Sequence, residues 1–156
     1  MTLTRTEAFT AFAGDAGERV RRALIATYGP ELGAEATAEA LVYGWEHWAR
    51  IAEMDNPAGY LYKVGRTKAR GRLGRKTPPL PEVQQPTGES WVEPGLPKSL
   101  QSLTSKQRAA VVLVHGYGWS YQEVSDLLGV SRSTVQQHVE RGLSHLREDL
   151  GVDVVS

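Results

Sequence analysis

The sequence predicts an all-α protein made of two small helical domains that a proline-rich linker joins. Apolar residues recur three and four positions apart along most of the chain, which is the spacing of an amphipathic helix. No stretch alternates between apolar and polar residues in the way a half-buried strand does. We therefore expect a helical domain over residues 1–76, a linker over residues 77–98 and a second helical domain over residues 99–152.

The first domain begins with an apolar helical pattern over residues 6–28. Gly14 and Gly17 interrupt this pattern and predict a break into two helices, and the pair Gly29-Pro30 ends it. A second pattern runs over residues 34–49. Its expected core positions are Leu41, Trp45 and Trp48.

A third helix is predicted to start at Asn56 and Pro57, because asparagine caps helices and proline suits the first helical position. The pattern continues to about Lys76. Glycines at positions 59, 65, 71 and 74 each cost up to about 1 kcal/mol relative to alanine inside a helix. The helix is therefore predicted to be intrinsically weak.

The linker contains Pro78, Pro79, Pro81, Pro86, Pro94 and Pro97. Such a density excludes a regular helix or a central strand, because proline has no backbone N–H. A fully extended linker of roughly 20 residues would reach about 70 Å, the length of roughly 20 base pairs. Trp91 has two interpretations of equal weight, a chance exposed aromatic or, with Val92, a docking element.

The second domain is marked by two capping boxes, Thr104 with Gln107 and Ser120 with Glu123, each of which predicts a helix start. The expected helices cover residues 99–102, 105–115, 121–128 and 132–148.

The last two helices meet at Gly129, which can take the positive φ of a tight turn. Ser131 is placed to cap the next helix, and Val135 lies four residues beyond it on the apolar side. This combination predicts a DNA-binding helix-turn-helix. A plain amphipathic hairpin with a glycine corner is the alternative.

The final helix keeps a polar face whose side chains can hydrogen-bond base edges and phosphates when the helix lies in a major groove. The candidate DNA-binding residues are Ser131, Arg132, Ser133, Thr134, Gln136, Gln137 and Arg141. We assign Arg132, Gln136 and Gln137 to base edges. The hydroxyl side chains at the helix N-terminus would hold phosphate together with the free backbone amides, and Arg141 would contact the DNA backbone.

The net charge of zero hides an uneven distribution. Residues 60–76 carry seven basic side chains and no acid, whereas residues 1–56 carry more acids than bases. A basic run of this kind is either a solvated surface or a nucleic-acid contact. Tyr60 and Tyr62 favour the second interpretation because aromatic rings beside cations suit stacked bases, although each ring is equally suited to the core.

Several classes of site are excluded or unsupported. The chain has no cysteine, which excludes disulfides and thiolate metal sites. Its four histidines are scattered, and no phosphate-binding loop follows a strand, so we expect no cofactor, no metal site and no enzymatic activity. The N-terminus has no long apolar run, so we expect no signal peptide, no membrane association and a cytoplasmic protein.

Several of these segments resemble the extracytoplasmic-function (group 4) sigma factors of the sigma-70 family, which are subunits of bacterial RNA polymerase. Residues 103–147 are similar to region 4, which reads the −35 promoter element. Residues 33–48 are similar to the region 2 helix that docks on the clamp of the polymerase β′ subunit, and residues 56–75 to the helix that engages the −10 element. Region 2 is matched less closely than region 4. The resemblance implies an all-α fold, promoter recognition and strand opening.

The resemblance also implies site residues and partners. The polymerase-binding candidates are Glu35, Glu39 and Glu46. The −10 candidates are Tyr60, Tyr62, Lys63, Arg66, Thr67 and Arg70, and Arg72 and Arg75 add basic charge to the same helix. The implied partners are core RNA polymerase, through its β′ clamp and β flap, and promoter DNA in double-stranded and melted form. An anti-sigma factor is left open.

A helix-turn-helix regulator that does not bind core polymerase is the main alternative. Such a regulator usually dimerises and carries a ligand-binding or receiver domain, and residues 1–76 show no strands for one. A polymerase-binding decoy that never touches DNA is a third interpretation, against which the polar face of the final helix argues.

Overall fold

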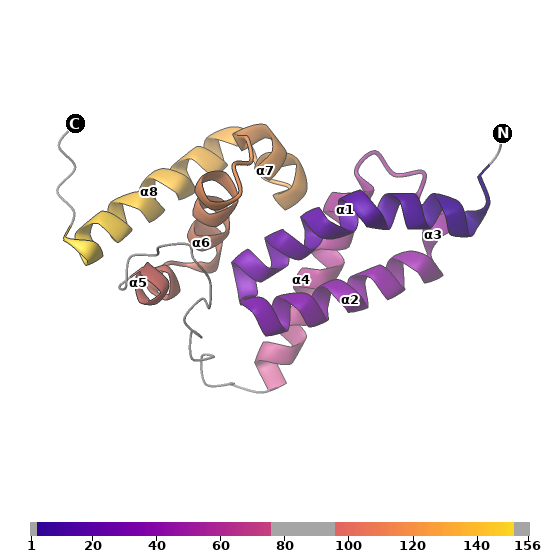
Figure 1. Ribbon diagram of the computed structural model, residues 1–156, viewed down its shortest axis with the longest axis horizontal. Coiled ribbons are helices and arrows are strands. Elements are labelled where there is room, and N and C mark those ends of the chain that lie inside the picture. The colour runs from indigo at the N-terminus through magenta and orange to yellow at the C-terminus, as the bar shows by residue number, and fades with distance from the viewer. Residues whose placement is uncertain (1–2, 76–95, 152–156) are drawn as a thin grey trace, which may run out of the picture.

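The computed structural model describes residues 3–75 and 96–151, and every element in these two ranges is a helix, as predicted (Figure 1). The N-terminal domain consists of α1 (Arg5–Tyr28), α2 (Pro30–Glu46), α3 (Trp48–Ile51) and α4 (Pro57–Arg75). The C-terminal domain consists of α5 (Leu96–Ser102), α6 (Ser105–Val111), the π-helical turn η1 (Val112–Gly116), α7 (Tyr121–Leu128) and α8 (Arg132–Leu150).

Helices α1 and α2 form a tight antiparallel hairpin. Gly29 ends α1 as predicted, with φ 94°, and only this residue separates the two helices. The predicted start of the second helix at residue 34 is wrong, because Pro30 occupies the first helical position, where its missing N–H costs nothing. Gly33 lets the helices approach closely, since a Cβ there would lie 2.5 Å from the Cα of Ile25.

The predicted break in the first helix is also wrong, because α1 is continuous over 24 residues. The exposed Gly14 remains helical, and Gly17 faces Leu41, whose methyl groups lie 3.6 Å from the position of a Cβ there. Packing along the α2 hairpin therefore outweighs the low helix propensity of the two glycines.

The predicted end of the second helix at residue 49 is wrong, because α2 stops at Glu46 and His47 leaves the helical region. The short α3 follows and buries Trp48, as expected for a core residue. Trp45 was expected in the core as well, but it is 39% exposed. Its ring packs on Phe9, with centroids 5.5 Å apart, and the Arg5 guanidinium lies over the ring at 4.7 Å from its centroid.

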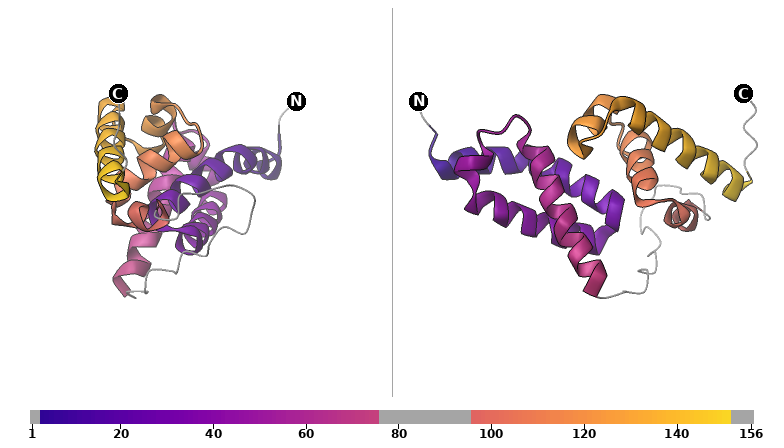
Figure 2. Two further views of the ribbon diagram at one scale, coloured as in Figure 1. Left: turned by 60° about the vertical axis from the view of Figure 1, so that its left-hand side comes forward. Right: turned by 180° about the vertical axis from the view of Figure 1, so that it is seen from behind.

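Helix α4 crosses the α1–α2 hairpin (Figure 2). As predicted, Asn56 caps it, since Asn56 Oδ1 accepts the Gly59 N–H at 3.0 Å. Leu61 and Tyr62 are buried, and Gly65 leaves room for Leu24 of α1. Burial against the hairpin therefore holds a helix whose glycines make it weak alone.

In the C-terminal domain, both predicted capping boxes form, at Thr104–Gln107 and Ser120–Glu123. The predicted helix over 105–115 changes into a π-helical turn at Val112, where the Tyr117 N–H reaches the Val112 carbonyl at 3.0 Å. Helix α5 begins at Leu96, inside the stretch predicted as linker. Trp91, the rest of that stretch and the C-terminal tail lie outside the described residues.

The two predicted domains share one buried core. Helix α6 packs against α1, and α7 packs against α4 (Figures 1 and 2). The buried cluster runs without a break from Val20 and Leu61 of the first domain to Leu113 and Val139 of the second. A joint core gives two small domains more buried apolar surface than each has alone.

Candidate nucleic-acid interface

The helix-turn-helix has the turn that the sequence predicted. Gly129 takes the left-handed conformation, with φ 71° and ψ 34°, and its N–H caps α7 on the Ser125 carbonyl. The buried Ser125 hydroxyl donates to the Val130 carbonyl at 2.6 Å, which ties the turn to α7. Two independent contacts therefore fix the angle at which α8 leaves α7.

Helix α8 is seated through one side only. Val135, Val139 and Leu146 are buried, and Gly142 lies so close to α6 that a Cβ there would come within 2.6 Å of Val111. This seating leaves the opposite side of α8 in solvent. The predicted residues that are exposed on it are Ser131, Arg132, Ser133, Gln136, Gln137 and Arg141, and Thr134 is half-buried.

The N-terminus of α8 is closed by its own hydroxyl groups. Ser131 Oγ accepts the Thr134 N–H at 3.1 Å, as predicted for the cap, and lies 3.0 Å from Ser133 Oγ. Farther along, the Gln136 amide donates to Glu140 Oε1 at 3.0 Å. Among the described residues, the hydrogen bonds of these polar groups stay within their own helix, so the candidate base-reading face needs no other element to keep its shape.

Positive charge lies beside this face on α6. Burial lowers the pKa of the half-buried His138, and the nearby charges of Lys106 and Arg141 lower it further. Lys106 is exposed on the first turn of α6 and was missed from the sequence, where it is one isolated base. Only the packing of α6 on α8 brings it to the candidate DNA side.

The basic face of α4 lies largely in solvent. Lys63, Thr67 and Arg70 are exposed and Arg66 is half-buried. The Thr67 hydroxyl donates back to the Lys63 carbonyl at 3.1 Å, so this side chain is already used within the helix.

The two tyrosines of α4 have separate environments. Tyr62 is buried and its hydroxyl lies 3.3 Å from that of Thr27, and burial raises its pKa, so its ring belongs to the core. Tyr60 is half-buried, 3.4 Å from an Arg50 nitrogen and 3.5 Å from the Tyr43 hydroxyl. The hydrogen bonds from Tyr43 and then Arg50 lower the pKa of Tyr60.

This Tyr43–Arg50–Tyr60 cluster was not predicted from the sequence. Its members come from α2, α3 and α4, and the guanidinium of Arg50 lies over the Tyr60 ring at 5.6 Å. An arginine beside two rings at the surface has the chemistry that unpaired bases stack on. Sequence patterns could not predict this cluster, because its three members lie far apart along the chain.

Two of the three predicted polymerase-binding glutamates have an internal partner. Glu35 Oε2 accepts from Arg72 Nη1 at 2.8 Å, and Glu39 accepts from the other terminal nitrogen of Arg72. Glu39, followed by Glu35, raises the pKa of Arg72. Glu46 is exposed at the other end of α2. The predicted docking face and the basic helix α4 are therefore joined by one arginine.

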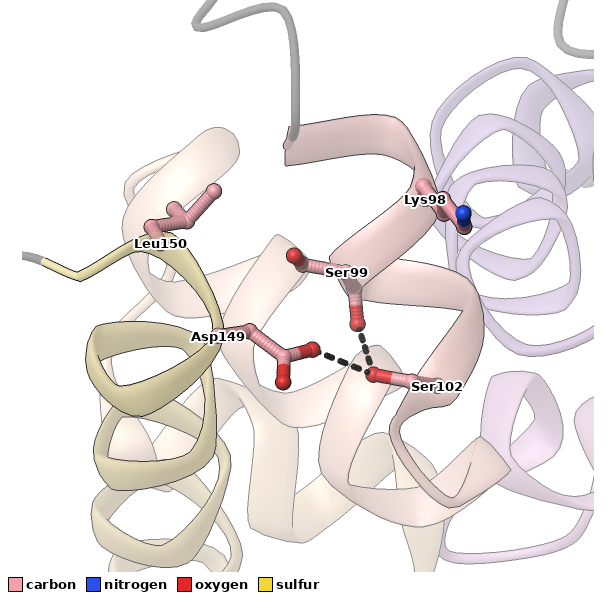
Figure 3. Close-up of a pocket in the computed structure, with 5 residues that line it drawn as sticks. All are labelled: Lys98, Ser99, Ser102, Asp149 and Leu150. Carbon is pink, nitrogen blue, oxygen red and sulfur yellow. Dashed lines mark hydrogen bonds between the residues drawn. The ribbon is translucent and has the colours of Figure 1, made fainter.

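A pocket of about 410 Å³ lies between α5 and the end of α8 (Figure 3). Ser102 Oγ lies 3.1 Å from Asp149 Oδ2 and 3.1 Å from His145 Nε2. In a catalytic triad the carboxylate orients the far nitrogen of the histidine, whereas here Asp149 approaches the same Nε2 that faces the serine, at 3.9 Å. The cluster is therefore a surface hydrogen-bond network between two helices.

The described residues hold no cluster of three or more histidine, aspartate or glutamate side chains that could bind a metal ion. Within the same ranges, none of the helices combines the length and apolar character needed to cross a membrane.

Comparison with known proteins agrees with this geometry. A family model for sigma-70, region 4 matches residues 96–146. An RNA polymerase sigma-E factor of Streptomyces antibioticus is 34% identical over 122 residues, which cover 73% of this chain and 67% of that protein. The chain belongs to the extracytoplasmic-function sigma factors of the sigma-70 family.

Two further matches support the family and the fold. An ECF RNA polymerase sigma factor of Mycolicibacterium smegmatis is 39% identical over 70 residues, which cover 45% of this chain and 27% of that protein. The sigma factor RpoE of Bartonella quintana, solved in complex with the anti-sigma factor NepR, has the same fold, with a TM-score of 0.66 and 20% identity over 94% of this chain and 98% of that one. Sigma factors are regulatory subunits of RNA polymerase and not enzymes. The family supports the sigma interpretation over the regulator without polymerase.

Proposed function

We propose that this sigma factor reads the −35 element with α8, engages the −10 element with α4 and docks on core RNA polymerase with α2. The observation that carries the proposal is the one-sided seating of α8. Its apolar side is buried in the helix-turn-helix while its polar N-terminal half is exposed. A helix held in this way can enter a major groove without rearrangement.

On α8 the base-reading residues are Arg132, Gln136 and Gln137. Arginine pairs bidentately with guanine and glutamine with adenine, and each such pair is worth about 1–3 kcal/mol of discrimination. Arg141 on α8 and Lys106 on α6 supply phosphate contacts at the edges of the same face. The serine and threonine hydroxyls at the helix N-terminus and the amides beside them complete the backbone contacts.

On α4 the −10 contacts come from Lys63, Arg66, Thr67 and Arg70, with the Tyr60 ring as the stacking surface for an unpaired base. Tyr43 and Arg50 support that ring and extend the surface. Stacking on an aromatic ring is worth about 1–3 kcal/mol per base and tolerates any base. Tyr62 is left out, since its ring is buried.

On α2 the carboxylates Glu35, Glu39 and Glu46 meet basic residues of the polymerase clamp. The first two must exchange Arg72 for the polymerase, and half-exposed ion pairs of this kind are worth about 1 kcal/mol or less, so the exchange is readily made. The proposal also includes the β flap of the polymerase as a second docking site, the cytoplasm as the site of action and an anti-sigma factor as a further partner. In this proposal the chain itself has no catalytic role.

The −35 assignment is tested by selecting bound promoters from a random DNA library with holoenzyme assembled from this chain and bacterial core polymerase. Arg132→Ala is expected to weaken binding about 5- to 150-fold and to relax the preference at one −35 position. Arg147→Ala removes an equal charge from an exposed site near the other end of α8 and is expected to change no base preference. An unchanged −35 preference in Arg132→Ala contradicts the assignment.

The polymerase assignment is tested by a pull-down with purified core polymerase. Glu35→Arg/Glu39→Arg is expected to abolish binding, while Glu53→Arg/Asp55→Arg makes the same charge change outside α2 and is expected to bind normally. Arg72→Ala frees both glutamates and is expected to bind at least as well as the wild type. Normal binding by the Glu35/Glu39 variant overturns docking through α2.

A further inference from the structure

Three basic side chains from two helices meet at one edge of the candidate −35 face. His138 and Arg141 lie three positions apart on α8, so both point to the same side of that helix. The third residue, Lys106, lies on the first turn of α6, which packs across α8 (Figure 1). These three residues form a basic cluster that spans both helices.

The packing of α6 on α8 holds the basic cluster together. A Cβ at Gly142 would lie 3.6 Å from the Cβ of Gln107 and 3.5 Å from its carbonyl oxygen. Gly142 lies directly after Arg141 and one turn after His138. Gln107 lies directly after Lys106 and closes the capping box that opens α6. The close approach of the two helices at this glycine therefore brings the three basic residues to one place.

Each member of the basic cluster can be reached from solvent. Arg141 and Lys106 are exposed, and His138 is half-buried. The base-reading candidate Gln137 directly precedes His138 and is exposed as well. A duplex read by Gln137 would therefore bring its phosphate backbone within reach of the cluster.

The two charges that act on His138 are both positive. Burial is the largest cause of its lowered pKa, and the charges of Lys106 on α6 and Arg141 on α8 lower the pKa further. Cationic groups that converge repel each other, so the free chain favours the neutral form of the His138 ring. Such a cluster gains nothing for the fold from its own charges.

Other charged groups on the helices around His138 are engaged elsewhere. Glu140 of α8 and Asp126 of α7 each accept a hydrogen bond from a glutamine of their own helix, and Glu123 of α7 accepts a backbone N–H of its capping box. Arg108 of α6 donates to α1, and α5 brings Lys98 near the far end of α8. The repulsion within the basic cluster is therefore left for an anion from outside the chain to offset.

A backbone phosphate has the chemistry that the basic cluster needs. Phosphate oxygens accept hydrogen bonds from an ammonium, a guanidinium and an imidazolium, and bonds between charged groups are the stronger ones. The negative charge of the phosphate would also favour the protonated form of His138, which the free chain disfavours. The exposed base-reading candidates beside the cluster point to DNA as the source of this phosphate.

We propose that His138, Lys106 and Arg141 bind one backbone phosphate of the −35 duplex, and that His138 takes up a proton from solvent when this phosphate binds. The proposal rests on the proposed −35 role of α8 and adds to it a further binding residue and a dependence on pH. The complex then binds one proton more than the free chain. Because the state with more bound protons is favoured as the pH falls, −35 binding is stronger at slightly acidic pH.

The pH dependence of duplex binding tests the proton uptake. The full chain is titrated with a fluorescent −35 duplex from the promoter that the holoenzyme selects, and anisotropy is recorded between about pH 8 and pH 5.5 at constant ionic strength. We expect the wild-type affinity to rise about 3- to 10-fold as the pH falls over this range. His138→Gln cannot take up the proton, so it should bind like the wild type at the upper pH and lack the rise.

His145→Gln is the matched control for this titration. It makes the same change on the same helix, at an exposed position whose ring faces Ser102 and not the basic cluster. We expect it to keep the wild-type rise in affinity. A rise that disappears in both histidine variants would contradict the assignment of the proton to His138.

The salt dependence separates a direct phosphate contact from an indirect effect on the fold. The wild-type slope of log affinity against log salt should be steeper by about 0.9 at the lower pH, because one more cation then neutralises a phosphate. The slope of His138→Gln should be the same at both pH values. Lys106→Ala should lower the slope at both, and should also weaken the pH dependence because less repulsion then keeps the ring neutral.

A measurement on the unaltered chain keeps the test decisive if a variant folds poorly. NMR titration of the His138 ring, in the free chain and in the complex with the duplex, gives its pKa in both states, and we expect the higher pKa in the complex. An equal or lower pKa in the complex, or a pH profile of His138→Gln identical to that of the wild type, overturns the proposal. Neither result touches the −35 assignment, which Arg132→Ala tests separately through base preference.

Discussion

Helices α8 and α4 are both proposed to contact DNA, but the structure treats their polar sides differently. The polar groups of the α8 face bond within their own helix, through Ser131 and Gln136. On α4, Arg72 is bound by α2 and Lys63 lies on the helix-turn-helix turn. The described polar groups of the proposed −35 face therefore bond within α8, whereas the basic side of the proposed −10 helix also contacts α2 and the turn.

The difference has a simple origin in how each helix is covered. Helix α8 packs on α6, α7 and α5, and its polar residues lie in solvent. Helix α4 packs on the α1–α2 hairpin and on α7 as well. Among the described residues each helix therefore has three neighbours, and the difference lies in Arg72 of α4, which pairs with Glu35 and Glu39 of α2. The proposed −10 helix is thus the one whose basic side is partly engaged inside the protein.

The largest effect is expected from filling the glycines that seat the two helices. A Cβ at Gly65 of α4 would lie 2.5 Å from Leu24, and one at Gly142 of α8 would lie 2.6 Å from Val111. We expect Gly65→Ala and Gly142→Ala each to lower the free energy of unfolding by about 1–3 kcal/mol, because an overpacked core must shift. Urea denaturation followed by circular dichroism measures this.

Gly71→Ala is the matched control on α4, since nothing lies within 4 Å of its Cβ position. It is expected to stabilise the chain by up to about 1 kcal/mol through helix propensity. If Gly142→Ala leaves the free energy of unfolding unchanged, α8 is not packed tightly on α6. The comparison could then no longer treat α8 as a helix held in a fixed position.

The next effect concerns the caps of the same two helices. Ser131→Ala removes only the cap of α8 and is expected to cost about 1 kcal/mol of unfolding free energy. Asn56→Ala removes the cap of α4 and also the bond to Asp126, so we expect a larger loss. Asn56→Asp keeps the capping oxygen and should recover the cap alone. Equal stabilities for the two Asn56 variants would show that the cap contributes nothing.

A smaller effect is expected in the salt dependence of −10 oligonucleotide binding. Arg70→Ala removes a phosphate contact and is expected to reduce the slope of log affinity against log salt by about 0.7. Arg72→Ala is expected to reduce it less in the free chain, because Glu35 and Glu39 already hold that arginine. Glu35→Gln/Glu39→Gln should release Arg72 and steepen the slope. Identical slopes for the two arginine variants would show that Arg70 and Arg72 do not differ in their availability to phosphate.

The smallest effect is a pH dependence that comes from His138 on α8. Its lowered pKa means that the folded chain binds a proton more weakly than the unfolded chain. Stability from this group is therefore unaffected above the ordinary histidine pKa of about 6.5 and falls as the pH drops below it. His138→Gln is expected to flatten the stability profile between about pH 6.5 and 5. An unchanged profile would place the acid sensitivity elsewhere.

Much of the fold was predictable because the responsible contacts are local. The caps at Thr104 and Ser120 join residues three positions apart, and Gly129 needs only its own φ. The errors arose where packing overrode local preference. Gly14 stays helical because α1 is held by α2, and the π-helical turn at Val112 follows no propensity of its residues.

The sequence by itself determined the helix-turn-helix, its caps and the residues on the polar side of α8, because a helix start and a helix face depend on spacings of three and four residues. Only the tertiary structure decided which of those polar residues remain available. Arg72 meets Glu35 across 37 positions, and Arg108 meets Ala26 across 82. No local pattern encodes such pairs, since they exist only once the helices have packed.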